Sequence, residues 1–499
     1  MTKLGKKITP EWVRYSKLSN STTDLVFVRS VTNNDGFVYT TGQFKGSVKI
    51  GQFNLQSTNL TPFIAKQDEC GQYIFVKTGT VSDIGAIIGA AYGSSITIDR
   101  QNRLFLLGRF KGNLQFEGVD LLSNPHEGRN IYIIRLDPCT GEAIWSLTTT
   151  IDPTVPAQPF DAAPKVINSD DHNSLYIFGD LMGSFLFGNT PISSGNGTNR
   201  DVFLAKISKN GKFIWANQSM EEGATDLQNS GNGLAFSNCH PGKIYIIGNF
   251  RKLIKFSQNI FRSTGRDVFI MSADTKTGAW LTGTQTVKHD ALETFGSAIV
   301  VYDNSLFATG YFSGTTEFGK KIFTTPVGVD FTCFISRLSF DFTFEKTIIV
   351  EASNNGTPHQ KAINIALGLE INNNSIYFSG IFRDRAKFGN LVELISSPNY
   401  SGFITEFTPS LKFIAQFRSF NLDENGDLNQ SMLTFPNPIS ADRLNRDSVY
   451  WIENFTGNIN VGQFPLSSDT IKNPALLLAP ENMFITKLDF SECQCPYKS

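Results

Sequence analysis

Apolar and polar residues alternate along this chain in short runs that are typical of β-strands, and one pattern recurs throughout. It consists of an apolar segment, a glycine, a phenylalanine two positions later and, six positions further on, an apolar residue usually followed by glycine. The first glycine, replaced by glutamate in the last copy, stands at Gly42, Gly108, Gly179, Gly248, Gly310, Gly380 and Glu453. The copies lie 62 to 73 residues apart, so seven of them account for nearly all 499 residues. That leaves no room for a separate catalytic domain of ordinary size.

Each copy predicts a set of short antiparallel strands. In the second copy these are 95–99, 103–110, 130–136 and 143–147, bounded by Gly, Asn, Asp and Pro. A further run at 113–116 gives one strand too many for four, so we expect the 113–122 region to be a hairpin continuation or an irregular edge. No segment shows a sustained helical period.

A four-stranded repeat that stacks radially is the blade of a β-propeller. The sequence therefore predicts an all-β chain that forms a single seven-bladed β-propeller over residues 1–499. The approximate blades are 20–80, 92–150, 163–222, 232–287, 296–352, 362–420 and 437–490. The last copy lacks its outer strand, and residues 11–18, which include Trp12, supply one. We expect this N-terminal strand to pair with the seventh blade and close the ring, which removes two open sheet edges.

The chain has 43 phenylalanines, which must bury much apolar ring surface. Six of them hold the same position of the repeat and are predicted to form inter-blade contacts: Phe44, Phe110, Phe250, Phe312, Phe382 and Phe455. Each burial contributes roughly 1.5–3 kcal/mol. A Phe-lined ligand groove is the alternative. The recurrent glycine indicates either a close approach of strands or a special backbone angle.

Residues 201–215, with the sequence DVFLAKISKNGKFIW, resemble the bacterial-type β-propeller repeat family known as SBBP. Segments 174–179, 243–248 and 375–380 resemble the strand that follows in that repeat. The resemblance implies the propeller fold but no common catalytic set, since members are mostly surface, secreted or assembly proteins. Similar repeats rich in Phe, Asn, Ile and Lys also occur in giant DNA viruses.

Charge and hydropathy limit the kinds of partner and the location that we expect for this chain. The 44 Lys and Arg residues balance 45 Asp and Glu, for a net charge of −1, so we expect no nucleic-acid binding. No run approaches the ~18 apolar residues of a membrane span, and no apolar segment follows the basic start. We therefore expect no membrane insertion, and a cytoplasmic or virion location rather than secretion. Six cysteines, including the close pair Cys493 and Cys495, make no disulfide framework.

The sequence holds no metalloprotease, phosphate-loop or nucleophile-elbow motif. One loop could bind calcium, because Asp423, Asn425 and Asp427 have the one-three-five oxygen spacing of calcium loops. Gly426 and Thr434 depart from that pattern, so the alternative is an ordinary acidic loop, and no other cofactor is expected. The first strands should line a central channel and offer it the polar residues Asp99, Lys165, Asn168, Asn364, Asp442 and Arg443.

These observations predict a non-enzymatic structural or interaction propeller, with protein partners or self-assembly, as a surface or virion component. Two alternatives remain open. One is a lectin-like propeller that binds glycans through aromatic and amide loop residues. The other is a hydrolase or lyase with its site at the channel mouth.

Overall fold

The chain is built from β-strands wherever its structure is described. The computed structural model describes residues 8–18, 24–117, 119, 122–155, 159–194, 199–220, 228–353, 361–421, 427–428, 438–442, 447–467 and 482–490. These ranges contain no helix, and so none that is long and apolar enough to cross a membrane. The all-β class expected from the sequence is confirmed.

Within the described residues, 28 of the 39 strands form seven antiparallel units of four. Unit 1 consists of β2 (Leu25–Asn34), β3 (Phe37–Ile50), β4 (Phe53–Gln67) and β5 (Tyr73–Ser82), and unit 2 of β6 (Ala90–Ile98), β7 (Leu104–Phe116), β9 (Asn130–Leu136) and β10 (Ala143–Thr148). Unit 3 consists of β12 (Asp161–Ser169), β13 (Leu175–Met182), β16 (Asp201–Ile207) and β17 (Phe213–Gln218). Unit 4 consists of β18 (Ser230–Phe236), β19 (Lys243–Phe256), β20 (Asn259–Asp274) and β21 (Trp280–Gln285).

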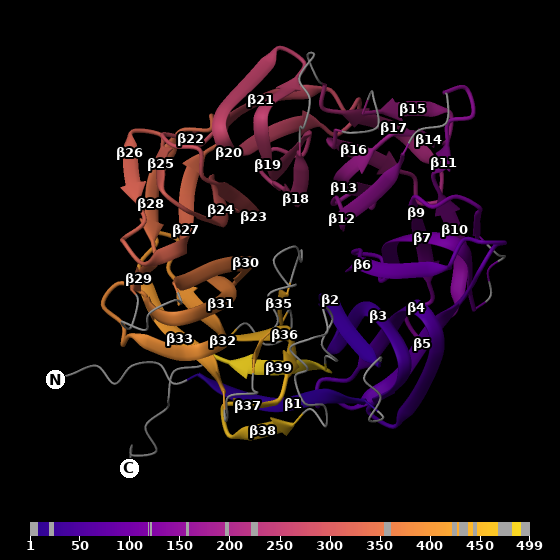
Figure 1. Ribbon diagram of the computed structural model, residues 1–499, viewed down its shortest axis with the longest axis horizontal. Coiled ribbons are helices and arrows are strands. Elements are labelled where there is room, and N and C mark those ends of the chain that lie inside the picture. Colours follow the sequence, from indigo (N-terminus) through magenta and orange to yellow (C-terminus); the bar gives the residue numbers. More distant parts are fainter. Residues whose placement is uncertain are drawn as a thin grey trace.

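Units 5 to 7 have the same order. Unit 5 consists of β23 (Thr294–Tyr302), β24 (Ser305–Phe312), β27 (Val329–Ser339) and β28 (Phe344–Ile349). Unit 6 consists of β30 (Ala362–Asn372), β31 (Ser375–Lys387), β32 (Leu394–Phe407) and β33 (Phe413–Asn421). Unit 7 consists of β35 (Ile439–Ala441), β36 (Ser448–Thr456), β39 (Asn482–Asp489) and β1 (Thr9–Leu18). The units are arranged around a centre, and first strands such as β6, β12, β18 and β30 lie nearest to it (Figure 1).

The recurrent glycine allows two strands of one unit to approach closely. A Cβ atom added to any of the six would lie 1.8–2.4 Å from a carbonyl oxygen of the first strand, for example that of Phe27 against Gly42. None of the six has a positive φ, so close approach rather than a special backbone angle explains the glycine. Directly after the residue that pairs with the glycine, each of these first strands carries one extra residue, a β-bulge.

Several second and third strands of the units run past the expected hairpins. β4 and β20 have 15 and 16 residues, so the expectation of only short strands is wrong for them. The 113–116 segment is the far end of β7, which pairs with β8 (Leu122–Asn124). In other units this far end is a separate hairpin: β14 (Ser184–Phe187) with β15 (Thr190–Ser193), β25 (Thr315–Phe318) with β26 (Lys321–Thr324), and β37 (Asn458–Val461) with β38 (Phe464–Ser467).

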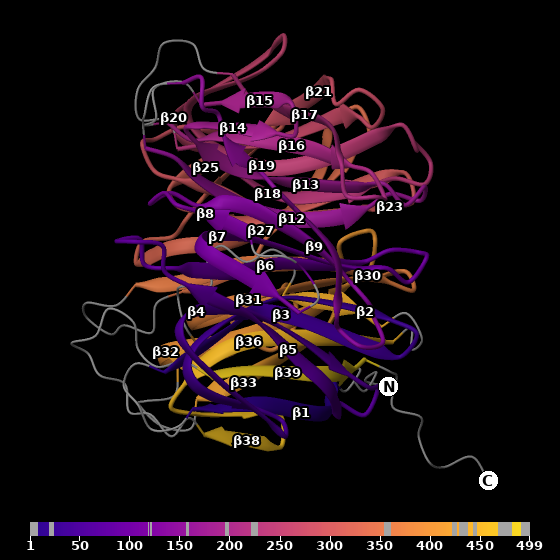
Figure 2. The same cartoon turned by 90° about the vertical axis from the view of Figure 1, so that its right-hand side faces the viewer.

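These far ends join consecutive units, because the chain leaving each unit pairs with the far end of the next one. The pairs are β5 with β7, β11 (Thr150–Ile151) with β14, Met220 with Lys255, β22 (Val287–Lys288) with β25, β29 (Glu351–Ser353) with β31, and β33 with β37. β1 does the same for unit 7, since it pairs along β39 and then with β3 of unit 1. Figure 2 shows indigo β1 beside yellow β39.

The apolar core lies between the units. The six phenylalanines are at most 1% exposed, and each belongs to a different hydrophobic cluster. The cluster around Phe44, for example, combines residues of unit 1 with Tyr450 and Ile485 of unit 7. Leu181, which replaces phenylalanine in unit 3, lies in a seventh cluster between units 2 and 3.

Candidate functional site

The bulge residues of the first strands are the part of the inner surface that side-chain chemistry distinguishes most. They are Arg29, Ser94, Lys165, Asn232, Ser297 and Leu367 in units 1 to 6. All but Leu367 are partly exposed, whereas the residues on either side of each are buried. In units 1 to 5 the bulge therefore turns one side chain away from the core.

In units 4 and 5 the bulge residue contacts the next unit. Asn232 Nδ2 donates to the carbonyl of Gly296 at 2.7 Å, and Ser297 Oγ donates to that of Ala366 at 2.7 Å. These hydrogen bonds fix one unit against its neighbour. In units 1 and 3 the equivalent residues are cations, Arg29 and Lys165.

Lys165 lies beside an ion network centred on Asp161, the first residue of β12. Arg129 donates to its Oδ1 at 3.1 Å, while Arg200 and Arg109 approach its Oδ2 at 3.4 and 3.7 Å. The three guanidiniums come from units 2 and 3, so the network spans the junction between those units. One carboxylate thus faces three cations.

A second carboxylate, Asp180, is also occupied. Its Oδ1 accepts from Arg200 Nε at 2.6 Å, and its Oδ2 accepts from Ser230 Oγ at 2.9 Å. Burial disfavours the charged guanidinium of Arg200, but Asp180 and Asp161 together hold its pKa above its ordinary value. We call Arg109, Arg129, Lys165, Arg200, Asp161 and Asp180 the cationic cluster. Its four cations face two carboxylates, although the whole chain has a net charge of −1.

Lys165 is the least stabilised cation of the cluster. Burial lowers the pKa of its ammonium group to about 8; Asp180 opposes this, while Arg109, Arg29 and Arg200 add to it. Burial also lowers the pKa of Arg109, an effect that Asp161 opposes. Within the described residues, Lys165 Nζ has neither a hydrogen bond nor an ion pair.

Aromatic rings border the cationic cluster. The guanidiniums of Arg109 and Arg129 lie 5.0 and 5.3 Å from the ring centroid of Tyr92. In unit 4, Arg266 lies 5.2 Å from the ring of Phe295 and its Nε is 3.4 Å from Glu293. Cations beside aromatic rings, next to amides such as Asn232, provide both charged and apolar contacts for a ligand.

The side chains of the candidate calcium loop lie outside the described part of the chain. Asp423 and Asn425 lie outside the described residues, and Asp427 belongs to the two-residue strand β34 (Asp427–Leu428), whose side chains are not described. In the ranges that are described, no three His, Cys, Asp or Glu side chains gather where they could hold a metal.

The other channel candidates do not converge. Asp99 pairs with Arg103 at the end of its strand, Asp442 is 3.1 Å from Lys487, and Asn364 is fully buried. Arg443 lies outside the described residues. Of this set only Lys165 belongs to the cationic cluster.

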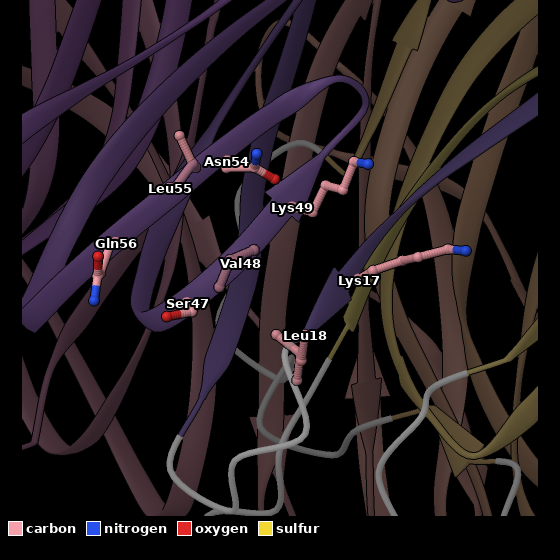
Figure 3. A pocket seen from close by; sticks show the side chains of 8 residues that line it. All are labelled: Lys17, Leu18, Ser47, Val48, Lys49, Asn54, Leu55 and Gln56. Atoms are coloured by element: carbon pink, nitrogen blue, oxygen red, sulfur yellow. The ribbon is translucent and has the colours of Figure 1, made fainter.

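A surface pocket of about 440 Å³ lies where β1 crosses to β3, far along the chain from the cluster. Its lining includes Lys17 and Lys49 together with Leu18 and Leu55. Figure 3 shows both lysine side chains extending to the same side, away from Gln56. None of its lining residues is acidic or aromatic, so it offers fewer kinds of contact than the cationic cluster.

The cluster as a whole was not predicted from the sequence, although its arginines recur at one position of the repeat. Arg129, Arg200 and Arg266 hold the same repeat position, directly before the third-strand core of units 2, 3 and 4. Glu293 of unit 5 holds the position of Asp161 and pairs with Arg266, whereas Asp180 has no carboxylate at its position in the other units.

Comparison with known proteins gives only distant structural similarity. No family model and no curated protein matches the chain. A protein of unknown function from Dyadobacter fermentans is 9% identical, with 97% of this chain and 99% of that chain covered and a TM-score of 0.38. An apocarotenoid oxygenase from Synechocystis is 10% identical (94% and 92% covered, TM-score 0.39). An ulvan lyase, a polysaccharide lyase, is 12% identical (82% and 95% covered, TM-score 0.38).

Proposed function

We propose that this chain is a single closed seven-bladed β-propeller that works as a non-enzymatic binding module for an acidic glycan. The ligand would contact the inner surface of units 1 to 4, where the cationic cluster, Arg29 and Tyr92 lie. The observation that carries the proposal is the excess of cations over carboxylates at one place in a chain with almost no net charge.

Ring closure is supported by repeated contacts. The ring of Trp145 in unit 2 packs on the turn glycine Gly211 of unit 3, and that of Trp215 packs on Gly278 of unit 4; a Cβ on either glycine would lie 2.6–2.9 Å from the ring. Trp12 of β1 packs in the same way on Gly71 of unit 1. Trp12 therefore acts as the outer-strand tryptophan of unit 7, and its indole donates to the carbonyl of Glu69.

Deletion of residues 1–18 tests the closure. It removes β1, exposes the edges of β39 and β3, and should lower Tm by about 10 °C or more, as followed by circular dichroism. Trp12→Ala and Trp145→Ala form a matched pair, because both remove a tryptophan from a turn glycine. Equal losses of Tm support closure, whereas an unchanged Tm after the deletion contradicts it.

A non-enzymatic role is consistent with the state of the two carboxylates. Asp161 and Asp180 both accept from guanidiniums, which favour their ionised form and leave them poorly suited to donate a proton to a substrate. The binding test is a glycan array that carries neutral and acidic oligosaccharides. We expect retention on the acidic ones alone, and retention on none would contradict the proposal.

Assembly of copies is the second candidate, and a specific observation favours it. Bulges in the outermost strands of units 1 to 4 expose Ile74, Ile144, Ile214 and Leu281 at equivalent positions, each 40–52% exposed. Light scattering across concentration separates the two roles. A monomer throughout supports the binding module, and rings or fibres support assembly.

A further inference from the structure

Lys165 differs from the bulge residues Asn232 and Ser297, which each hold the next unit through a hydrogen bond. Asn232 and Ser297 use the same backbone position to donate to the next unit, whereas Lys165 Nζ makes no hydrogen bond or ion pair within the described part of the chain. Its side chain is nevertheless only partly exposed. A cation that is half removed from water without a partner lowers stability.

The surroundings of Lys165 add positive charge. Arg29 of unit 1, Arg109 of unit 2 and Arg200 of unit 3 all act on it electrostatically, and Asp180 is the one carboxylate among the groups that do. Asp180 is already occupied by Arg200 and Ser230. The positive potential at Lys165 is therefore only partly compensated, which favours an incoming anion.

Two guanidiniums that act on Lys165, those of Arg109 and Arg29, are suited to share such an anion. Arg109 makes the longest of the three contacts with Asp161, 3.7 Å, so it gives up least by turning to a ligand. Arg29 extends from the same bulge position as Lys165, two units away. Guanidinium groups bind carboxylates and sulfates through paired hydrogen bonds, and an ammonium adds a point charge.

We infer that Lys165, with Arg29 and Arg109, forms a subsite that binds one anionic group of the ligand, a carboxylate or a sulfate ester. The inference rests on the proposed function and specifies which part of the glycan enters the inner surface. It also explains why a destabilising lysine stands where Asn or Ser would hold two units together.

The test is calorimetric titration of the full-length protein with three probes. These are trigalacturonate, which carries carboxylates, a sulfated chondroitin disaccharide, and neutral maltotriose. We expect one or both anionic probes to bind and maltotriose not to bind. Lys165→Met should weaken anion binding at least tenfold, while its Tm stays at or above that of the wild type.

Lys206→Met is the matched control in the same unit. Lys206 donates to the carbonyl of Thr275 at 3.0 Å and lies 5.1 Å from the ring of Tyr176, so it is a structural lysine. Its replacement should lower Tm and leave anion affinity unchanged. Affinity in the wild type should also fall above about pH 8, where Lys165 loses its charge. The charged groups that act on it are Arg29 (β2), Arg109 (β7), Asp180 (β13) and Arg200 (before β16).

The outcomes separate the inference from the proposed function. Anion affinity equal in Lys165→Met and wild type overturns the inference, and so does an equal loss in both lysine variants. Binding of maltotriose or other neutral glycans alone overturns the inference but leaves a glycan-binding module. Failure to bind any glycan, on the array or in solution, overturns both.

Discussion

Units 1 and 3 and units 4 and 5 use one backbone device for opposite purposes. In all four, a glycine on the second strand lets a carbonyl of the first strand approach, and a bulge follows. In units 4 and 5 the bulge side chain holds the next unit. In units 1 and 3 it is a cation that adds to a positive surface. The repeat therefore fixes where a side chain points, and residue identity decides whether the position serves stability or binding.

The largest effect should come from removing the shared device. A Cβ at Gly179 would lie 2.4 Å from the carbonyl oxygen of Ala163, and one at Gly310 would lie 1.8 Å from that of Phe295. Valine at either position should lower the free energy of unfolding by about 3 kcal/mol or more, because the strands must separate. Chemical denaturation measures this loss.

Gly242→Ala is the control for that pair, since a Cβ there would meet nothing within 4 Å. Its stability should stay within ~0.5 kcal/mol of the wild type. If the valine variants of Gly179 and Gly310 lost very different amounts of unfolding free energy, units 3 and 5 would not share one backbone arrangement.

Unit 7 differs from the other units at the position of the recurrent glycine. Glu453 replaces the glycine and is fully buried; burial raises the pKa of its carboxyl to about 8, opposed by a hydrogen bond from the Trp451 indole at 3.1 Å. Between pH ~4.5 and 8 the folded state keeps a proton that the unfolded state has released. Glu453 therefore destabilises the fold progressively as pH rises through this window.

Glu453→Gln removes this titration while keeping an acceptor for Trp451. The variant should match the wild type near pH 5 and be more stable by about 2 kcal/mol at pH 8, as measured by urea unfolding at both pH values. A stability difference that does not change with pH would mean that Glu453 is ionised in the fold. Tyr377→Phe in unit 6 is a control whose effect should not change with pH, because burial raises the pKa of Tyr377 far above this range and phenylalanine has no titrating group.

The sequence predicted the parts of this molecule that repeat and missed those that do not. The spacing of Gly42 and its counterparts, the buried Phe44 position and a role for Trp12 all follow from seven-fold repetition, because each copy repeats the same packing problem. The meeting of Asp161 with its three arginines could not be predicted, since the four side chains come from two units, 2 and 3, and from separate strands that meet only after folding. Lys165 was among the residues that the sequence offered to the channel, and the bulge, which shifts the alternation by one residue, turns its side chain away from the core.

The smallest stability changes are expected at the bulge residues themselves, where units 3 and 4 differ. Asn232→Ala removes the donor to Gly296 and leaves that carbonyl and Asn249 Oδ1 without it, which should lower stability by about 1–2 kcal/mol. Alanine at Lys165, the equivalent position of unit 3, should leave stability equal or higher, because it removes a cation from a positive site. Opposite signs in the same denaturation assay would show that one bulge position holds units together while the other is kept for a ligand. Equal losses at both would mean that Lys165 is structural, like Asn232.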